Sequence, residues 1–285
     1  SSAASDVYKR QMLAYNHRWG DFGWDTSFTY STNKNEIVEL VRNYVHPETG
    51  VIYNVDKLEL KTNEGRGFGK AKFILKEGGT LGDLYTHADL KRDINGNVLI
   101  DDDGNVTAVD NAGDIKLGSV LPKANLAWNN SFTYKGINAG FLVTARLGGI
   151  VYSATQAYLD LYGVSETSAA ARDAGGVWVN DRSQVNPQSF YSVVASQSGL
   201  PTYYTYSATN VRLQEAHIGY TIPRRWLGNV CDINVSLVGR NLWMIYCKAP
   251  FDPEAVATTN NYYQGIDYFM MPSTRNIGFN VKINF

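Results

Sequence analysis

The final segment of the chain, residues 274–285, carries the pattern that most restricts its possible folds. From Ile277 to Phe285 every odd position is apolar, and from Asn276 to Asn284 every even position is asparagine, glycine or lysine. Period-two alternation predicts a β-strand with one apolar and one polar face. A strand of a soluble sandwich shows such alternation over fewer residues, whereas a strand of an outer-membrane barrel needs about ten residues to cross the bilayer. The segment favours a membrane strand, provided that other segments share its design.

The same alternation returns along the chain, and the connections between the alternating segments are sorted by length. Short turns are predicted at 19–21, 135–136 and 223–229, and long interruptions at 33–122, 149–210 and 241–273. Short and long connections follow one another strictly, which is typical of barrels with tight turns on one side of the membrane and long loops on the other. Random loop placement in a sandwich does not produce this order. The sequence therefore predicts an all-β protein, an antiparallel transmembrane β-barrel or a piece of one.

Composition excludes several classes of protein. Among 285 residues, 26 Lys and Arg nearly balance 27 Asp and Glu, so no net charge favours a nucleic-acid partner. No apolar run reaches the length of about 18 residues that a transmembrane helix needs. The two cysteines, Cys231 and Cys247, would lie far apart on one strand and are interpreted as free thiols, and no metal-site spacing is present.

The first ten residues, SSAASDVYKR, lack any periodicity. They resemble a spurious translated leader, and we exclude residues 1–10 from the predicted fold as a non-native segment.

Several short motifs occur in a fixed order and together resemble one family. They are Lys76–Asp83 (KEGGTLGD), Gly113–Gly118 (GDIKLG), Gly219–Pro223 (GYTIP), Gly239–Trp243 (GRNLW), Pro250–Glu254 (PFDPE), Gly265–Tyr268 (GIDY) and Pro272–Arg275 (PSTR). With the strand–turn–strand at 124–148, they resemble the C-terminal part of a SusC/RagA-type TonB-linked outer-membrane transporter. The resemblance covers residues 11–285, with 33–122, 149–210 and 241–273 as extracellular loops.

The resemblance implies a roughly 22-stranded, plugged barrel of which this chain is a C-terminal fragment. It also implies the outer membrane of a Gram-negative bacterium, contact with outer-membrane lipid, and TonB-dependent import of an oligosaccharide or peptide. The implied partners are a SusD-like surface lipoprotein and the TonB complex, the latter through a missing N-terminal part. It implies no enzymatic activity, no cofactor and no nucleic-acid partner.

Aromatic residues in or beside the long interruptions are the candidate contacts for cargo or for the lipoprotein. They are Trp178, Tyr203, Tyr204, Trp243, Tyr246, Tyr262, Tyr263 and Tyr268. Two interpretations stay open: interfacial girdle and loop packing, or a platform on which sugar rings or peptide side chains stack. A second set, Phe279, Val281, Ile283 and Phe285, forms the terminal aromatic strand that resembles a barrel-assembly signal.

Three other interpretations stay open at the level of the sequence. The acidic segment 93–105 places Asp93, Asn95 and Asn97 at the spacing of calcium ligands, but it lacks the bidentate glutamate and also fits a solvated hairpin. Glu215 and His217 share one strand face and suggest the acid–base pair of a barrel hydrolase. A soluble, lectin-like β-rich binding module is the third.

Overall fold

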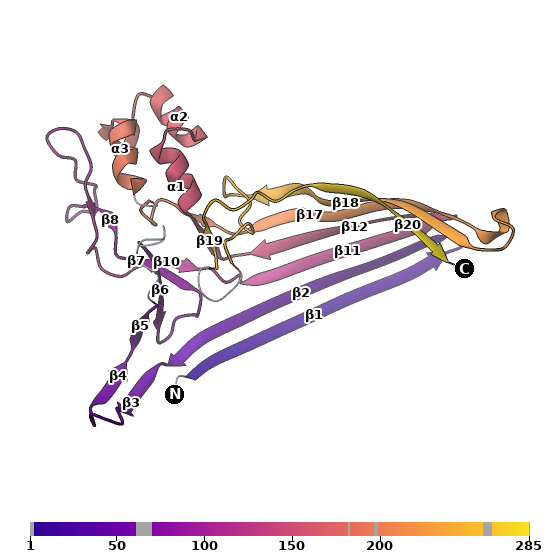
Figure 1. Ribbon diagram of the computed structural model, residues 1–285, viewed down its shortest axis with the longest axis horizontal. Coiled ribbons are helices and arrows are strands. Elements are labelled where there is room, and N and C mark those ends of the chain that lie inside the picture. The colour runs from indigo at the N-terminus through magenta and orange to yellow at the C-terminus, as the bar shows by residue number, and fades with distance from the viewer. Residues whose placement is uncertain (1–2, 61–69, 182, 197–198, 259–263, 285) are drawn as a thin grey trace.

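Seven long strands form one antiparallel sheet that runs the length of the molecule (Figure 1). The computed structural model describes residues 3–60, 70–181, 183–196, 199–258 and 264–284. The strands lie side by side in chain order: β1 (Ala3–Trp19), β2 (Phe22–Glu39), β11 (Ala124–Tyr134), β12 (Ile137–Leu147), β17 (Asn210–Ile222), β18 (Asp232–Cys247) and β20 (Asn276–Asn284). Within the described residues, β1 and β20 each pair on one side only.

The three short turns all lie at one end of the sheet and the three long connections at the other (Figure 1). Lys135 and Gly136 join β11 to β12 with φ angles of 47° and 89°, the positive values that a two-residue hairpin turn requires. The turn after β17 contains a 3-10 helix, η2 (Arg224–Trp226), and Arg224 pairs with Asp232 at 3.2 Å. The predicted sorting of short and long connections is confirmed.

Strand register gives the sheet one apolar and one polar face. One row across six neighbouring strands consists of Phe22, Tyr134, Ile137, Tyr220, Val235 and Val281. The adjacent row, which points to the opposite face, consists of Gly23, Thr133, Asn138, Gly219, Ser236 and Asn280. The alternation predicted from the sequence therefore continues from strand to strand across β2, β11, β12, β17, β18 and β20.

Asn130 interrupts the apolar face. It pairs in register with Thr26, so both polar side chains share that face with Trp24 and Trp128. The indole of Trp24 donates to Asn130 Oδ1 at 3.1 Å, and that of Trp128 donates to Thr26 Oγ1 at 3.1 Å. Each tryptophan thus provides a hydrogen-bond donor to a polar oxygen on the apolar face, where Asn130 itself is buried.

In the residues that the structure describes, the long connections contain helices and short strands. The first contains β3 (Val41–Val45), β4 (Ile52–Val55), β5 (Lys57–Glu59), β6 (Ala71–Lys76), β7 (Asp83–Thr86), β8 (Asp89–Leu90), β9 (Ala108–Val109) and β10 (Ile115–Ser119). The second contains β13 (Ile150–Ser153), α1 (Ala154–Leu161), α2 (Glu166–Asp173), β14 (Val177–Asn180), β15 (Ser183–Val185), α3 (Pro187–Val194) and β16 (Thr205–Ser207), and the third contains β19 (Ile266–Asp267).

The helices begin at residues that satisfy their free amides. Ser153 caps α1 and Ser165 caps α2, each through its side-chain oxygen, and Asn186 caps α3 directly before Pro187. None of the helices in the described part of the chain is long and apolar enough to cross a membrane.

The buried apolar core lies in the connections. Its largest members include Phe73, Leu84, Tyr152, Leu200 and Ile266, contributed by all three connections. Many large side chains on the apolar face of the sheet, by contrast, are exposed, among them Phe28, Trp128 and Phe279. The packed core of the described residues therefore lies in the connections, while much of the apolar face of the sheet is uncovered.

Two expectations about segment boundaries need correction. Residues 3–10 do have a place in the fold, because β1 begins at Ala3 and pairs with β2 as far as Glu39; the non-native origin of residues 1–10 stays a prediction. The strands are also longer than the alternation indicated, since β2 continues past residue 33 and β18 past residue 241. Regular backbone pairing therefore extends into segments where the strict side-chain alternation has ended.

Candidate functional site

The polar face of the sheet carries the residues on which the hydrolase alternative depended. Glu215 lies opposite Arg240 in register, and Arg240 Nε donates to Glu215 Oε2 at 2.9 Å. His217 lies two rows further along on the same face, in register with Gly140. Glu215 therefore has an arginine partner, and the geometry gives no support to an acid–base pair with His217.

Two motifs of the first connection bind each other. Lys116, in the segment 113–118, donates to Asp83 Oδ2 at 2.5 Å, and Asp83 ends the segment 76–83. The side chain of Asp83 is 1% exposed, and Thr80 Oγ1 donates to its other oxygen at 2.8 Å. Buried carboxylates need such partners, so these motif residues hold β7 against β10.

Asp114, from the segment 113–118, forms a second set of polar contacts within the first connection. Its oxygens lie 2.6 Å from Lys57 Nζ and 2.9 Å from His87 Nε2. The hydrogen bond from Lys57 lowers the pKa of Asp114 and outweighs the effect of its desolvation. The carboxylate is held ionised and links β5 to the segment before β10.

Arg212 forms a buried clamp between the sheet and the third connection. Its guanidinium donates to both carboxylate oxygens of Asp252, at 2.7 and 3.2 Å, and lies 3.1 Å from Glu254. The side chains of Arg212 and Asp252 are 5% and 9% exposed. Burial alone would raise the pKa of Asp252, but hydrogen bonds from Arg212 and Ser273 keep it below its usual range. The PFDPE motif thus fixes its connection to β17.

The end of the third connection is tied as well. Ser153 Oγ donates to Asp267 Oδ2 at 2.6 Å, and Asn241 Nδ2 donates to the carbonyl of Thr274 at 3.2 Å. Asp267 belongs to GIDY, Asn241 to GRNLW and Thr274 to PSTR. Three of the motifs that carry the family resemblance, PFDPE, GIDY and PSTR, therefore contain residues that attach the third connection to the sheet or to the second connection.

The predicted aromatic residues do not form one cluster. Trp178 is exposed on β14, and Tyr268 contacts the rings of Tyr158 and Phe269. Tyr203 packs against the core and its ring contacts Phe190. Tyr262 and Tyr263 lie outside the described residues.

Tyr204 is the clearest departure from the prediction of a surface contact. It is 2% exposed, and its hydroxyl donates to Asp160 Oδ2 at 3.0 Å. Burial, together with Asp160, raises the pKa of Tyr204, and burial raises that of Tyr206 to about 12. Tyr204 contributes to the core of the second connection, where it satisfies a buried carboxylate.

Trp243 and Tyr246 lie on the apolar face of the sheet. Trp243 pairs in register with Leu213, and Tyr246 with Val211. Both are exposed near the end of β18 that leads into the third connection. Of the two interpretations left open by the sequence, this position favours an interfacial girdle for these two residues.

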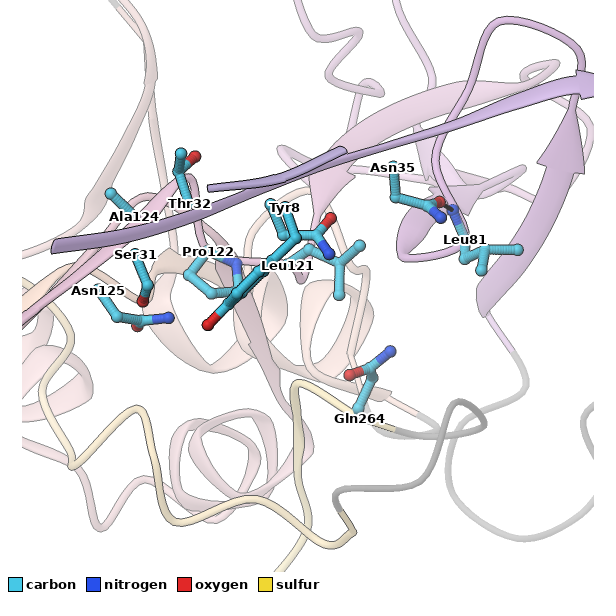
Figure 2. A pocket seen from close by; sticks show the side chains of 11 residues that line it. Tyr8, Ser31, Thr32, Asn35, Leu81, Leu121, Pro122, Ala124, Asn125 and Gln264 are labelled. Atoms are coloured by element: carbon cyan, nitrogen blue, oxygen red, sulfur yellow. Dashed lines mark hydrogen bonds between the residues drawn. The ribbon is translucent and has the colours of Figure 1, made fainter. Parts of the chain in front are cut away.

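A cavity of about 280 Å³ lies between β2 and the first connection (Figure 2). Figure 2 shows Leu121 and Pro122 near its centre, Asn35 and Leu81 at one end and Asn125 at the other. The complete lining is uncharged and consists of Tyr8, Ser31, Thr32, Asn33, Asn35, Leu81, Leu121, Pro122, Ala124, Asn125 and Gln264. The sequence analysis missed it because its amides belong to an ordinary polar strand face, and Tyr8 belongs to the excluded segment 1–10.

The proposed assembly strand and the acidic hairpin are both exposed. Phe279, Val281 and Ile283 lie on β20, and Phe285 lies outside the described residues. In the hairpin, Asp93 Oδ1 accepts from the amides of Asn95 and Asn97 at 2.8 Å, and Asp101 repeats this turn. These oxygens stabilise tight turns, and the described residues include no group of three or more His, Cys, Asp or Glu placed to hold a metal ion.

The chain is similar to two curated proteins of Formosa agariphila. It is 25% identical to TonB-dependent receptor P3 over 92% of this chain and 27% of the receptor. It is 22% identical to TonB-dependent receptor P39 over 93% of this chain and 28% of the receptor. No protein-family model matches the chain.

Two solved structures share its fold. They are the RagAB peptide transporter, with a TM-score of 0.62 and 14% identity, and the RagAB peptide importer in the 'closed-closed' state, with a TM-score of 0.64 and 15% identity. Each comparison covers 100% of this chain and 30% of the solved chain. The resemblance to TonB-linked transporters that the motifs predicted is confirmed, and the chain spans less than a third of the length of each of these proteins.

Proposed function

We propose that this chain forms part of the barrel wall and external loops of a TonB-dependent outer-membrane importer of a Gram-negative bacterium. The proposal assigns it residues 11–285, with the rest of a roughly 22-stranded barrel, the plug and the TonB-contacting segment elsewhere in the parent protein. It is supported by similarity along 92% of the chain to a TonB-dependent receptor of which the chain spans 27%. The proposed role is transport, without catalysis.

The observation that carries the proposal is the apolar face of the sheet together with the position of the connections. Phe28, Trp128, Ile218, Leu237 and Phe279 are all at least 40% exposed on that face. Burying one such side chain is worth about 1.5–3 kcal/mol, so a face of this extent is costly in water and favourable against lipid. A soluble binding module would instead cover it, which makes that alternative the weaker one.

In this proposal the polar face and the folded connections line the path of the cargo. The uncharged cavity beside β2 offers amide and hydroxyl groups at the end of the polar face nearest the connections. Such groups fit an oligosaccharide or the backbone of a peptide, the two cargo classes that the resemblance implies. We further propose that a SusD-like surface lipoprotein covers the connections, and that import against a gradient draws on the inner-membrane TonB system.

The test uses the full-length parent, expressed with its neighbouring lipoprotein in an outer membrane. Uptake of labelled oligosaccharides and labelled peptides is measured with and without TonB, for the parent and for an Asn125→Ala variant. Ile94→Ser, on the exposed hairpin, is the matched control. We expect uptake of one cargo class that requires TonB. Uptake that persists without TonB, with no lipoprotein co-purified, would mean a passive pore.

A further inference from the structure

Val120 lies where the three long connections meet. It follows β10 in the first connection and is only 1% exposed. Its amide donates to the carbonyl of Gly82 at 2.9 Å, and its carbonyl accepts from Arg146 Nη2 on β12, also at 2.9 Å. Both polar groups of its backbone are therefore satisfied, each by a different part of the chain.

Three glycines, one from each connection, closely approach Val120. A Cβ atom added to Gly265 would lie 2.6 Å from Cγ1 and 2.7 Å from Cβ of Val120, and one added to Gly82 would lie 3.1 Å from its Cγ2. A Cβ at Gly149 would lie 3.1 Å from the carbonyl oxygen of Val120. Gly265 also has a φ angle of 68°, which glycine adopts without strain. All three connections are therefore packed against one buried residue.

The contacts of Val120 also fix part of the cavity beside β2. Three residues that line this cavity are direct sequence neighbours of Val120 or of the glycines that contact it: Leu81, Leu121 and Gln264 (Figure 2). Because close-packed interiors switch between discrete arrangements and do not deform continuously, a shift of the third connection away from Val120 would move Gln264 and allow Leu121 to repack. The shape of the cavity therefore depends on contacts that are made outside it.

We propose that Val120 is a positioning residue for this cavity and couples it to the third connection. Its buried side chain keeps Leu121 and Gln264 in place on the cavity wall, so the cavity loses its shape when the third connection loosens. Because coupling between two sites is reciprocal, a ligand in the cavity tightens the third connection in return. This inference rests on the proposed function for the ligand of the cavity, whereas the coupling rests on contacts within the chain.

Hydrogen exchange of the full-length parent in detergent tests the coupling. Val120→Ala removes both methyl groups, and Gly265→Ala adds a Cβ at the contact. The reporters are the amide of residue 120 and that of Tyr152, which donates to the carbonyl of Gly265 at 2.9 Å. We expect each variant to exchange on the order of tenfold faster at both amides, because lost or crowded buried contacts destabilise packing. Val194→Ala removes the same methyl groups from an equally buried valine of α3 and should leave both amides nearly unchanged.

The double variant Val120→Ala/Gly265→Ala distinguishes a direct contact from general loosening. The change at residue 120 removes Cγ1, the atom closest to the new Cβ at residue 265. Exchange in the double variant should therefore be slower than the product of the two single effects, as it is for residues in contact. Single effects that simply multiply would overturn the coupling, and so would an unchanged Tyr152 amide in Val120→Ala.

Uptake into cells tests the positioning role and separates it from the proposed function. TonB-dependent uptake of labelled oligosaccharides and labelled peptides is compared for the parent, Val120→Ala and Val194→Ala. We expect Val120→Ala to raise the concentration at half-maximal uptake by about fivefold or more, with an unchanged maximal rate per folded barrel, and Val194→Ala to behave as the parent. An unchanged half-maximal concentration in Val120→Ala would overturn the positioning role. Absence of TonB-dependent uptake in the unmodified parent would refute the proposed function, while hydrogen exchange still decides the coupling.

Discussion

Replacing Arg212 by methionine should release the third connection from the sheet. Methionine retains much of the apolar volume of arginine but removes the two hydrogen bonds to Asp252 and the contact with Glu254. Asp252, with its side chain 9% exposed, then remains as a buried carboxylate without its cation. The change should affect residues 248–258 and 264–275 more than the rest of the molecule.

The expected magnitude follows from burial. Removing one partner of a buried ion pair costs about 3–5 kcal/mol, and we take the lower end because Glu254 is 41% exposed and gains little from the contact. At about 1.4 kcal/mol per factor of ten, local opening should become on the order of 100-fold more frequent. The matched control is Arg240→Met, since the exposed pair Arg240–Glu215 should contribute only about 0–1 kcal/mol.

Hydrogen exchange of the full-length parent in detergent measures this opening. The amide of Ala257, which donates to the carbonyl of Ile266 at 2.8 Å, is the reporter. Because the folded pKa of Asp252 is lowered, the clamp is fully stabilising above the unfolded value of about 3.9 and weakens as the pH falls through the folded value. Protection of Ala257 in Arg212→Met equal to that in Arg240→Met would refute the reasoning.

Three further predictions concern the sheet and the connections. Phe279→Arg should destabilise the barrel by about 2–4 kcal/mol if residue 279 lies near the membrane midplane, whereas Asn280→Arg on the polar face should cost far less. The free energies are measured by refolding from denaturant into lipid, and equal costs would mean that the register is wrong. Tyr204→Phe removes a hydrogen-bond donor from the buried carboxylate of Asp160 and should destabilise the second connection by about 1–3 kcal/mol. Residues 150–208 should then resist protease less, and unchanged resistance would count against the buried role of Tyr204. Deleting Phe285 from the parent should strongly lower its outer-membrane level, and a normal level would remove the assembly role given to the last strand.

The strands and their faces were predictable because alternation records them directly. The pattern from Ile277 to Ile283 gave the correct face for each residue, and Lys135-Gly136 gave the turn. Where a strand continues without alternation, as β2 does beyond residue 33, the sequence does not show that the strand continues. Backbone pairing there depends on neighbouring strands that lie close only after folding.

The connections were far less predictable. Asp252 and Arg212 are 40 residues apart, and Ser153 and Asp267 are 114 apart, so composition cannot reveal that they meet. The sequence around Tyr204 resembles that of an exposed, tyrosine-rich loop. In the structure its side chain is nevertheless buried, because its hydroxyl donates to Asp160. The resemblance singled out the motifs without showing that Asp252 and Thr274 attach the third connection to the sheet.

The central claim, that one face of this sheet meets lipid, is tested most directly by cysteine accessibility along β18. With Cys231 and Cys247 replaced by serine in the parent, single cysteines are placed at Asn234, Val235, Ser236, Leu237 and Val238. Each is labelled in intact outer membranes with a water-soluble maleimide and, separately, with a lipid-soluble one. We predict that residues 235 and 237 react with the lipid-soluble reagent and that residues 234, 236 and 238 react with the water-soluble one. Uniform labelling of all five by the water-soluble reagent would contradict the account.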